Sequence, residues 1–139
     1  MKPFVVAFTT AAIVQLYKFF SHWAVNGRPL FARLIQTGGM PSSHSAAVAA
    51  LSTTTFLMVG PRNPLFGVTL YLSLIVMYDA AGVRRAAGRQ AAILNRMLEE
   101  HEDRELRERR LLELLGHTPF EVVVGAAIGV ALALAWDAI

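Results

Sequence analysis

The sequence contains no cysteine, and outside one segment it contains few charged residues. The lack of cysteine excludes disulfides and thiolate metal sites, although it leaves the redox compartment undetermined. We also expect no cleavable signal peptide, because the first apolar run ends in the letters QLYKFF instead of a small-residue cleavage site. An arginine- and serine-rich transit peptide is equally lacking.

Charge is scarce over most of the chain. Of the 23 Asp, Glu, Lys and Arg residues, 15 lie between Arg84 and Glu113, which leaves eight for the other 109 positions. About 7% charged residues cannot cover the surface of a soluble domain, for which roughly 25% is usual. The chain is also 55% hydrophobic, with a mean hydropathy of +0.46. These proportions indicate one domain of 139 residues that lies mostly in lipid.

Four apolar segments without charge cover residues 4–17, 45–59, 64–78 and 122–136. Each is about 15 residues long, below the roughly 20 that span a bilayer, so taken alone they would also suit the core of a soluble bundle. Flanking aromatic residues and Lys18, which can snorkel, favour the membrane interpretation. We therefore predict an all-α integral membrane bundle of four transmembrane helices, forming a single domain over residues 1–139. In the last segment, Gly125 and Gly129 would let another helix approach closely.

Lysine and arginine are distributed unevenly between the loops. Three lie between the first and second segments and eight arginines between the third and fourth, whereas the opposite side has only Lys2 and Arg62. The positive-inside rule then places two loops in the cytoplasm: the one between the first and second segments and the one between the third and fourth. Both chain termini are then expected outside a cell membrane. Residues 84–115 are predicted to form a charged cytoplasmic helical insertion, since Glu100 and Arg104 begin a series of acid-before-base pairs four apart. The positive-inside distribution accounts for the excess of lysine and arginine in these loops. We therefore expect that the protein does not bind nucleic acid.

The stretch from Gly38 to Ser45, with the letters GGMPSSHS, combines loop residues with a helix start. Its proline suits the first helical turn, and Ser42 or Ser43 can cap the free N–H groups there. Helix N-termini attract anions, and His44 titrates near neutral pH. The stretch therefore suggests either a phosphate site with an acid–base histidine or an ordinary capped loop.

A similar arrangement precedes the last apolar segment. Thr118 is a good N-cap, Pro119 fits the first helical position, and Glu121 completes a capping box, which alone would explain this glutamate. His117 stands at this helix start as His44 stands at the earlier one, and the topology puts both starts on one membrane face. Two helix termini, two histidines and several arginines can then converge on one anion, which outlines a phosphoryl-transfer site.

The end of the third apolar segment carries an acid close to several arginines. Asp79 lies at a depth where carboxylates are expensive, and Arg84, Arg85 and Arg89 follow within a few turns. Arginine suits phosphate because its donors match two phosphate oxygens at once. The alternative is an ion pair that anchors the helix at the membrane surface.

The sequences PSSHSA and LGHTPFEVVVG resemble the histidine motifs of the type 2 phosphatidic acid phosphatases, whose superfamily includes the vanadium haloperoxidases. Together with YDAAGVRRAAGRQA..LN, and in this order in a short chain, they resemble more closely the divergent branch of that superfamily, which comprises bacterial and plant membrane proteins. The resemblance covers nearly the whole chain.

By this resemblance, the superfamily's PSGH motif falls on residues 41–44, which makes His44 the general acid. His117 is then the nucleophile that takes the phosphoryl group, and Glu121 is the carboxylate that orients it. No metal or other cofactor is expected, because cations and helix termini stabilise the charge. The expected substrate-binding residues are Arg84, Arg85, Lys18, Gly39, Ser42, Ser43, Arg89 and Asp79.

The sequence departs from the superfamily pattern at several positions. Leu111 occupies the position of an arginine that precedes the nucleophile, and we expect Arg84 or Arg85 to take that role. Ser43 replaces the glycine of PSGH, and Glu121 replaces an aspartate.

The resemblance implies a membrane phosphatase that hydrolyses a lipid phosphate or pyrophosphate at the cytoplasmic membrane face. A phospholipid such as phosphatidate or phosphatidylglycerophosphate, or a polyprenyl diphosphate, would suit a polar site at the bilayer edge. The alternative is a non-catalytic membrane protein that binds anionic lipid headgroups or a protein partner through the same arginines and helix ends. A haloperoxidase ranks third. The sequence does not choose the substrate or the oligomeric state.

Overall fold

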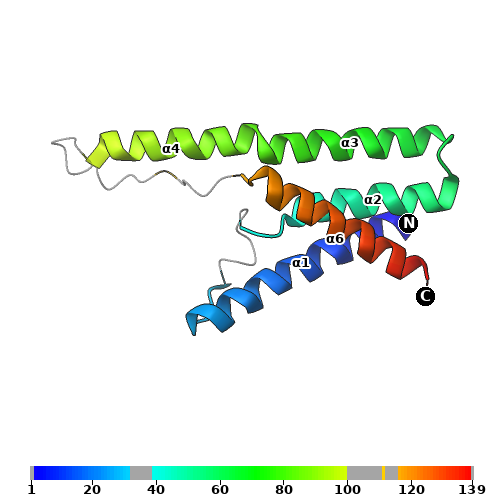
Figure 1. Cartoon of the computed structure of the whole chain (residues 1–139), viewed down its shortest axis with the longest axis horizontal. Coiled ribbons are helices and arrows are strands. Elements are labelled where there is room, and N and C mark those ends of the chain that lie inside the picture. The colour runs from blue at the N-terminus through cyan, green and yellow to red at the C-terminus, as the bar shows by residue number, and fades with distance from the viewer. Residues whose placement is uncertain (1, 32–38, 100–110, 112–115, 139) are drawn as a thin grey trace.

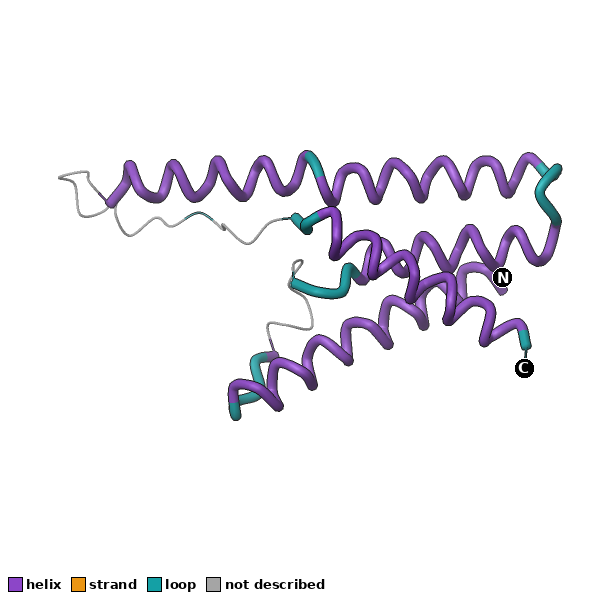
Figure 2. The backbone as a smooth tube through the Cα atoms, viewed as in Figure 1, coloured by secondary structure: helices purple, strands orange, loops and turns teal. Residues whose placement is uncertain are grey.

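The computed structural model describes residues 2–31, 39–99, 111 and 116–138, and within these ranges it contains helices and loops but no strand (Figure 2). The prediction of an all-α fold is therefore confirmed for the described part of the chain. The helices are α1 (Lys2–Asn26), α2 (Ser43–Val59), α3 (Pro64–Ala81), α4 (Val83–Glu99) and α6 (Pro119–Asp137).

Helix α2 lies at the centre of the bundle and packs against α1, α3 and α6. The two chain ends and the turn between α2 and α3 lie at one end of the bundle, and the starts of α2 and α6 lie toward the other (Figure 1). An ion pair of 2.8 Å between Lys2 Nζ and Asp137 Oδ1 joins the first and last helices at the former end. The α2 and α6 termini therefore face the same side, as the sequence predicts.

Three helical stretches are long and apolar enough to cross a membrane: α1, the α3–α4 stretch from Pro64 to Glu99, and α6. Large apolar side chains point outward along them, and those of Phe8, Val68 and Val123 are each more than 60% exposed. Soluble proteins rarely expose apolar surface on this scale. In a membrane protein, the lipid chains cover such a surface. The location in a membrane is thus supported, and α2, with 17 residues, is the shortest of the apolar helices.

Small and hydroxylated residues make the contacts between helices. A Cβ atom added to Gly129 would lie 2.1 Å from the carbonyl oxygen of Ala46, so this face of α6 touches the backbone of α2. The glycine pair in the last segment therefore admits another helix, as predicted. Between α2 and α3, the hydroxyl oxygens of Ser52 and Ser73 lie within hydrogen-bond distance of each other, and each also lies within hydrogen-bond distance of the Val48 carbonyl oxygen. Such residues replace the hydrophobic effect as the means of helix association in lipid.

The helix boundaries differ in part from those predicted. Helix α1 continues to Asn26, beyond the predicted apolar segment 4–17, because no helix-breaking residue follows that segment before Gly27, whose φ is +68°. Helix α2 begins at Ser43 with Ser42 as its N-cap, so Pro41 precedes the helix and does not lie in its first turn as predicted. The hydroxyl of Ser42, the residue after Pro41, accepts a hydrogen bond from the free Ser45 N–H at the start of the helix.

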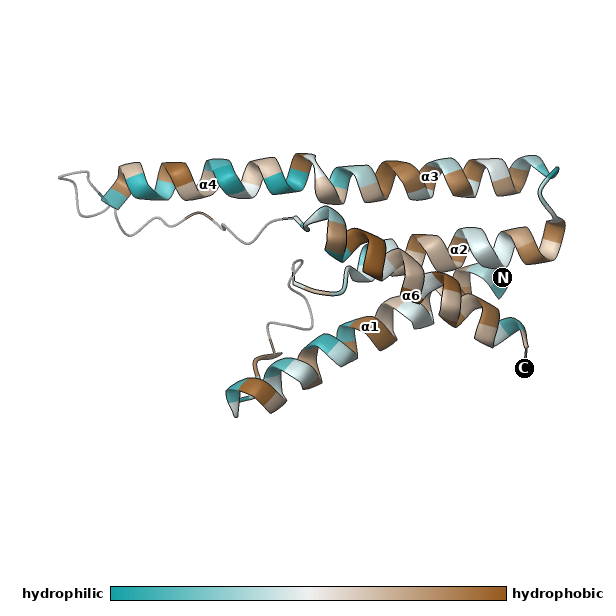
Figure 3. Ribbon diagram, in the orientation of Figure 1, coloured by the Kyte–Doolittle hydropathy of each residue, from teal (hydrophilic) through white to brown (hydrophobic). Residues whose placement is uncertain are grey.

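Helix α4 is the described part of the predicted insertion, and it continues α3 in nearly the same direction after a break at Gly82 (Figure 1). Charged and apolar residues alternate along α4, whereas α3 is mostly apolar (Figure 3). The Asn95 side chain bonds both backbone groups of Leu111, at 2.9 and 2.8 Å, which places the returning chain beside α4. The predicted pairs that begin with Glu100 and Arg104 lie outside the described residues.

Candidate functional site

His117 lies in the loop that leads into α6, and backbone contacts hold this loop against the end of α3. The His117 N–H donates to the carbonyl of Ala80 at 2.9 Å. Gly116 has a φ of +84°, and a Cβ added there would lie 2.3 Å from the backbone nitrogen of Arg85. Only glycine suits both the conformation and the close approach. As a result, the His117 side chain is only 4% exposed.

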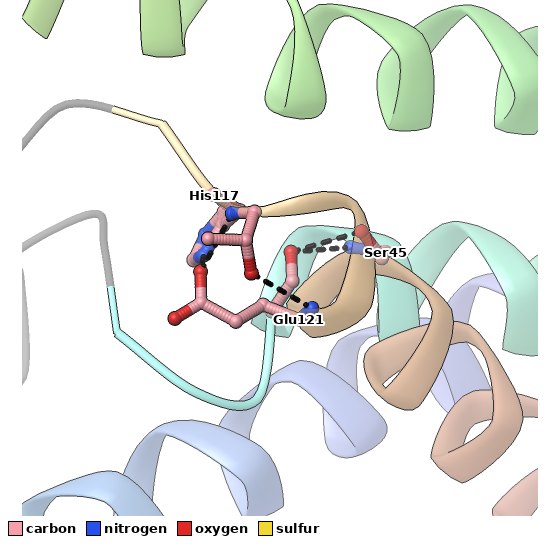
Figure 4. A network of polar contacts seen from close by, with 5 residues as sticks. Ser45, His117 and Glu121 are labelled. Atoms are coloured by element: carbon pink, nitrogen blue, oxygen red, sulfur yellow. Dashed lines mark hydrogen bonds and ion pairs between the residues drawn. The ribbon is translucent and has the colours of Figure 1, made fainter. Parts of the chain in front are cut away.

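Glu121 connects the helix cap to this histidine. Thr118 and Glu121 form the predicted capping box: the Thr118 N–H donates to Glu121 Oε2 at 2.8 Å, and the Glu121 N–H donates to the Thr118 hydroxyl at 3.2 Å. The same Oε2 atom lies 3.3 Å from His117 Nδ1 (Figure 4). Glu121 therefore both caps α6 and orients the imidazole, so capping alone does not account for its position.

The start of α2 is attached to the first turn of α6. The buried Ser42 hydroxyl accepts hydrogen bonds from the Ser45 N–H at 3.3 Å and the Ser45 hydroxyl at 2.9 Å (Figure 4). The Ser42 N–H donates to the carbonyl of Glu121 at 3.3 Å. The Ser42 side chain is therefore used for capping α2. The backbone bond to Glu121 attaches the start of α2, which carries His44, to the start of α6, which follows His117.

The two histidines line one small pocket, although they are 73 positions apart in the chain. His117 is buried and His44 is exposed, so one imidazole forms the inner wall while the other is open to solvent. The pocket lies where α2, α3, α4 and the loop before α6 meet. Its lining residues are His44, Val76, Ala80, Arg84, Gly116 and His117.

Positive charge reaches the pocket from two sides. Arg84 Nε lies 2.6 Å from Asp79 Oδ2, which is the ion pair that the alternative interpretation of this segment expects. Both side chains are more than one-third exposed, so the pair positions the guanidinium and contributes little to stability, about 0–1 kcal/mol. Lys18, buried in α1, lies within electrostatic range of both histidines.

The surroundings of His117 favour its neutral form. Burial lowers the pKa of His117 below its usual value, and the charges of Lys18 and His44 lower it further. The Glu121 carboxylate opposes this by its charge and its hydrogen bond, but the pKa stays lowered. A neutral imidazole whose Nδ1 proton points at a carboxylate presents Nε2 with a free lone pair.

The other predicted site residues lie farther from this pocket. Gly39 lines a second groove together with Lys18, and Ser43 is the half-buried first residue of α2. Arg85 contributes its backbone beneath Gly116, while its side chain is exposed and does not line the pocket. Arg89 is exposed one turn farther along α4. Of the three arginines proposed, the structure thus brings only Arg84 to the histidines.

Sequence reasoning missed Gly116, the residue that lets the loop carrying His117 approach the backbone of α4. A glycine directly before the histidine is the only sequence signal, and many loops contain one. Among the described residues, no group of three or more His, Cys, Asp or Glu side chains is placed to hold a metal ion.

Comparison with known proteins identifies the family of the chain. The family model described as "Divergent PAP2 family" matches residues 1–132 of the chain. The chain is also similar to the uncharacterized membrane protein YuiD of Bacillus subtilis (strain 168), with 38% identity over 144 residues that cover 95% of this chain and 91% of the relative. No solved structure matches the chain. The resemblance seen in the three sequence motifs is therefore confirmed, and this chain is a membrane protein of the divergent PAP2 family.

Proposed function

We propose that this protein is a membrane phosphatase that hydrolyses a lipid phosphate or diphosphate through a phosphohistidine intermediate. One observation carries the proposal: His117, buried and held by Glu121, lines the same pocket as His44 and Arg84. A nucleophile, a second imidazole for proton transfer and a fixed cation are the groups that phosphoryl transfer through histidine requires.

In the first step, His117 Nε2 attacks the phosphorus atom. The new N–P bond forms as the bond between phosphorus and the leaving oxygen breaks, and protonated His44 gives its proton to that oxygen. Glu121 stabilises the positive charge that develops on the His117 ring. Arg84 and Lys18 neutralise charge on the phosphoryl oxygens, as preorganised cations do in such sites.

In the second step, a water molecule attacks the phosphohistidine. His44, now neutral, accepts a proton from the water while the P–N bond breaks and its electron pair returns to His117 Nε2. Inorganic phosphate then leaves, and both histidines regain their starting protonation states.

The proposal includes a topology of four membrane spans. Helix α2 carries no Asp, Glu, Lys or Arg, and it packs at the centre of the bundle with its 17 residues reaching about 26 Å, close to the roughly 30 Å of a bilayer core. With the arginine-rich loops inside, the pocket opens at the cytoplasmic face and α4 belongs to a cytoplasmic insertion. A lipid substrate then presents its phosphate to the pocket from the inner leaflet.

The test is phosphate release by purified protein in detergent from phosphatidate, phosphatidylglycerophosphate, and polyprenyl mono- and diphosphates. His117→Ala is expected to lower kcat/KM by about 10³-fold or more, because it removes the nucleophile. His44→Ala should lower it by about 10²–10⁴-fold, because it removes general acid catalysis. Vanadate, which mimics five-coordinate phosphorus, should inhibit the wild-type protein.

Arg62→Gln, at the far end of the bundle, provides the control and should keep full activity. Headgroup binding by the wild-type protein without turnover of any substrate would instead establish a non-catalytic lipid-binding protein. Equal activity of wild-type protein and His117→Ala would overturn the assigned nucleophile.

A further inference from the structure

A second groove lies at the end of α1, next to the residues that directly precede α2, and we call it the α1 groove. It is lined by the last turns of α1 and by the loop that leads to α2: Lys18, Ser21, His22, Val25, Asn26, Gly39 and Met40. The α1 residues recur at spacings of three and four, so they share one face of the helix. The groove is wide and open, whereas the histidine pocket is narrow and more enclosed.

The lining of the α1 groove suits an anion. Lys18 supplies a positive charge, while His22 and Asn26 add N–H groups. The Nδ1 atom of His22 is buried and has no hydrogen-bond partner in the described chain. Among the described residues, none that lines the groove carries a carboxylate.

Lys18 connects the two sites. It lines the α1 groove, and its charge also acts on both His44 and His117. One bound molecule with two adjacent anionic groups can therefore place one group against the histidines and the other in the α1 groove, with Lys18 between them.

We propose that the α1 groove binds the second phosphate of the substrate, so that the preferred substrate is a lipid diphosphate instead of a monophosphate. This inference rests on the proposed function and specifies its substrate class. The terminal phosphoryl group enters the histidine pocket, and the phosphate attached to the lipid lies in the α1 groove.

The reaction then has a defined leaving group. His117 Nε2 bonds to the terminal phosphorus, and the bond from that phosphorus to the bridging oxygen breaks. The electron pair stays on the bridging oxygen, which takes the proton of His44 and becomes part of the lipid monophosphate, while the Lys18 charge and a His22 N–H group stabilise its remaining negative charge. Water then hydrolyses the phosphohistidine as before, so the products are a lipid monophosphate and inorganic phosphate.

Binding measurements test the proposal independently of turnover. The probes are a farnesyl methylenebisphosphonate, whose P–C–P bridge cannot be hydrolysed, and the matching farnesyl monophosphonate, each titrated calorimetrically into the detergent-solubilised protein. His22→Leu and Asn26→Leu should each weaken bisphosphonate binding about tenfold or more, the effect of losing a hydrogen bond to a charged group. Both should leave monophosphonate binding within about twofold. Tyr17→Phe, an exposed position of α1 outside the groove, is the matched control.

The same variants are then compared by kcat/KM on farnesyl diphosphate and farnesyl monophosphate. A loss confined to the diphosphate supports the proposal, and a His22→Asn variant that keeps an N–H donor should restore part of it. Equal losses on both probes, or no loss on either, would overturn the proposal. Absence of turnover on both substrates, with bisphosphonate binding still dependent on His22, would reject the proposed phosphatase while leaving the second-phosphate site in place.

Discussion

The imidazole of His117 is held by contacts from three elements. Its backbone bonds to the end of α3, its Nδ1 atom faces Glu121 at the start of α6, and the preceding Gly116 lies against α4. None of these contacts is strong alone. Together they fix both the position and the tautomer of a buried ring, which a nucleophilic histidine requires.

Replacing Glu121 with glutamine tests this orientation. Glutamine can keep the capping box, so the helix should remain intact, but it removes the negative charge that raises the pKa of His117. The acidic limb of the profile of kcat/KM against pH should move to lower pH, because His117 then loses its proton more readily. The plateau should fall by about 10²–10⁴-fold as the correct tautomer is lost. Asp137→Asn, at the other end of α6, serves as the control, and an acidic limb that stays in place or moves upward would contradict the role.

Gly116→Ala tests the approach of the loop to the first turn of α4. The added Cβ meets the Arg85 backbone at 2.3 Å, so the loop must move away and carry His117 from the pocket. Activity should fall by more than tenfold, and the strain of positive φ should lower the free energy of unfolding by about 1–2 kcal/mol.

Gly27→Ala is the matched control for this substitution. Gly27 has a similar φ of +68°, but nothing lies within 4 Å of its added Cβ. The conformational strain should lower the thermal unfolding midpoint of this variant, while its phosphatase activity should stay at the wild-type level. Similar activity of the two variants would mean that the contact between Gly116 and Arg85 does not position the site.

At the scale of elements, α6 and α2 form a unit whose shared end carries the chemistry. Gly125 and Gly129 let the two backbones touch, and the Ser42 N–H bonds to the carbonyl of Glu121 at the end nearest the pocket. Close packing along the helices therefore determines how near His44 lies to His117. In lipid this packing depends on small residues, because apolar side chains gain little by leaving a similar solvent.

Gly129→Val should separate these helices. A Cβ at this position lies 2.1 Å from the Ala46 carbonyl, which the rigid α2 backbone cannot relieve. Overpacking of this kind costs about 1–3 kcal/mol or more, which thermal unfolding in detergent should detect. Gly67→Val on α3, where nothing lies within 4 Å of the added atom, should change the midpoint little. Equal midpoints for the two variants would show that the α2–α6 contact is not close in the protein.

At the scale of the whole molecule, the bundle combines a lipid-exposed exterior with a polar end. Apolar side chains cover the outer faces of α1, α3 and α6, and arginines gather at the end where α2 and α6 begin. The asymmetry predicts an orientation, because arginine-rich loops remain on the cytoplasmic side.

The absence of native cysteine makes this topology directly measurable. Single substitutions Arg28→Cys and Arg62→Cys in intact cells should respond differently to a maleimide that cannot cross the membrane. Arg62→Cys should be labelled from outside, and Arg28→Cys only after the cells are lysed, since α2 separates the two positions. Labelling of both from one side would show that α2 does not span the membrane, and the reverse pattern would invert the orientation.

The sequence by itself determined the all-α class, the membrane environment and the family. These follow from local properties, because apolar runs, helix caps such as Thr118 with Glu121, and contiguous motifs need no information about distant contacts. The lysine and arginine counts likewise predict an orientation without coordinates.

Only the tertiary structure decided which of the candidate residues meet. Arg84 and Arg85 are adjacent, chemically identical and both exposed, yet only Arg84 lines the pocket that holds the two histidines. The contact between Gly116 and α4, and the position of Lys18 and Gly39 in one groove, depend on backbone paths that bring together residues far apart in sequence. Such juxtapositions arise from helix packing, which no local pattern in the sequence encodes.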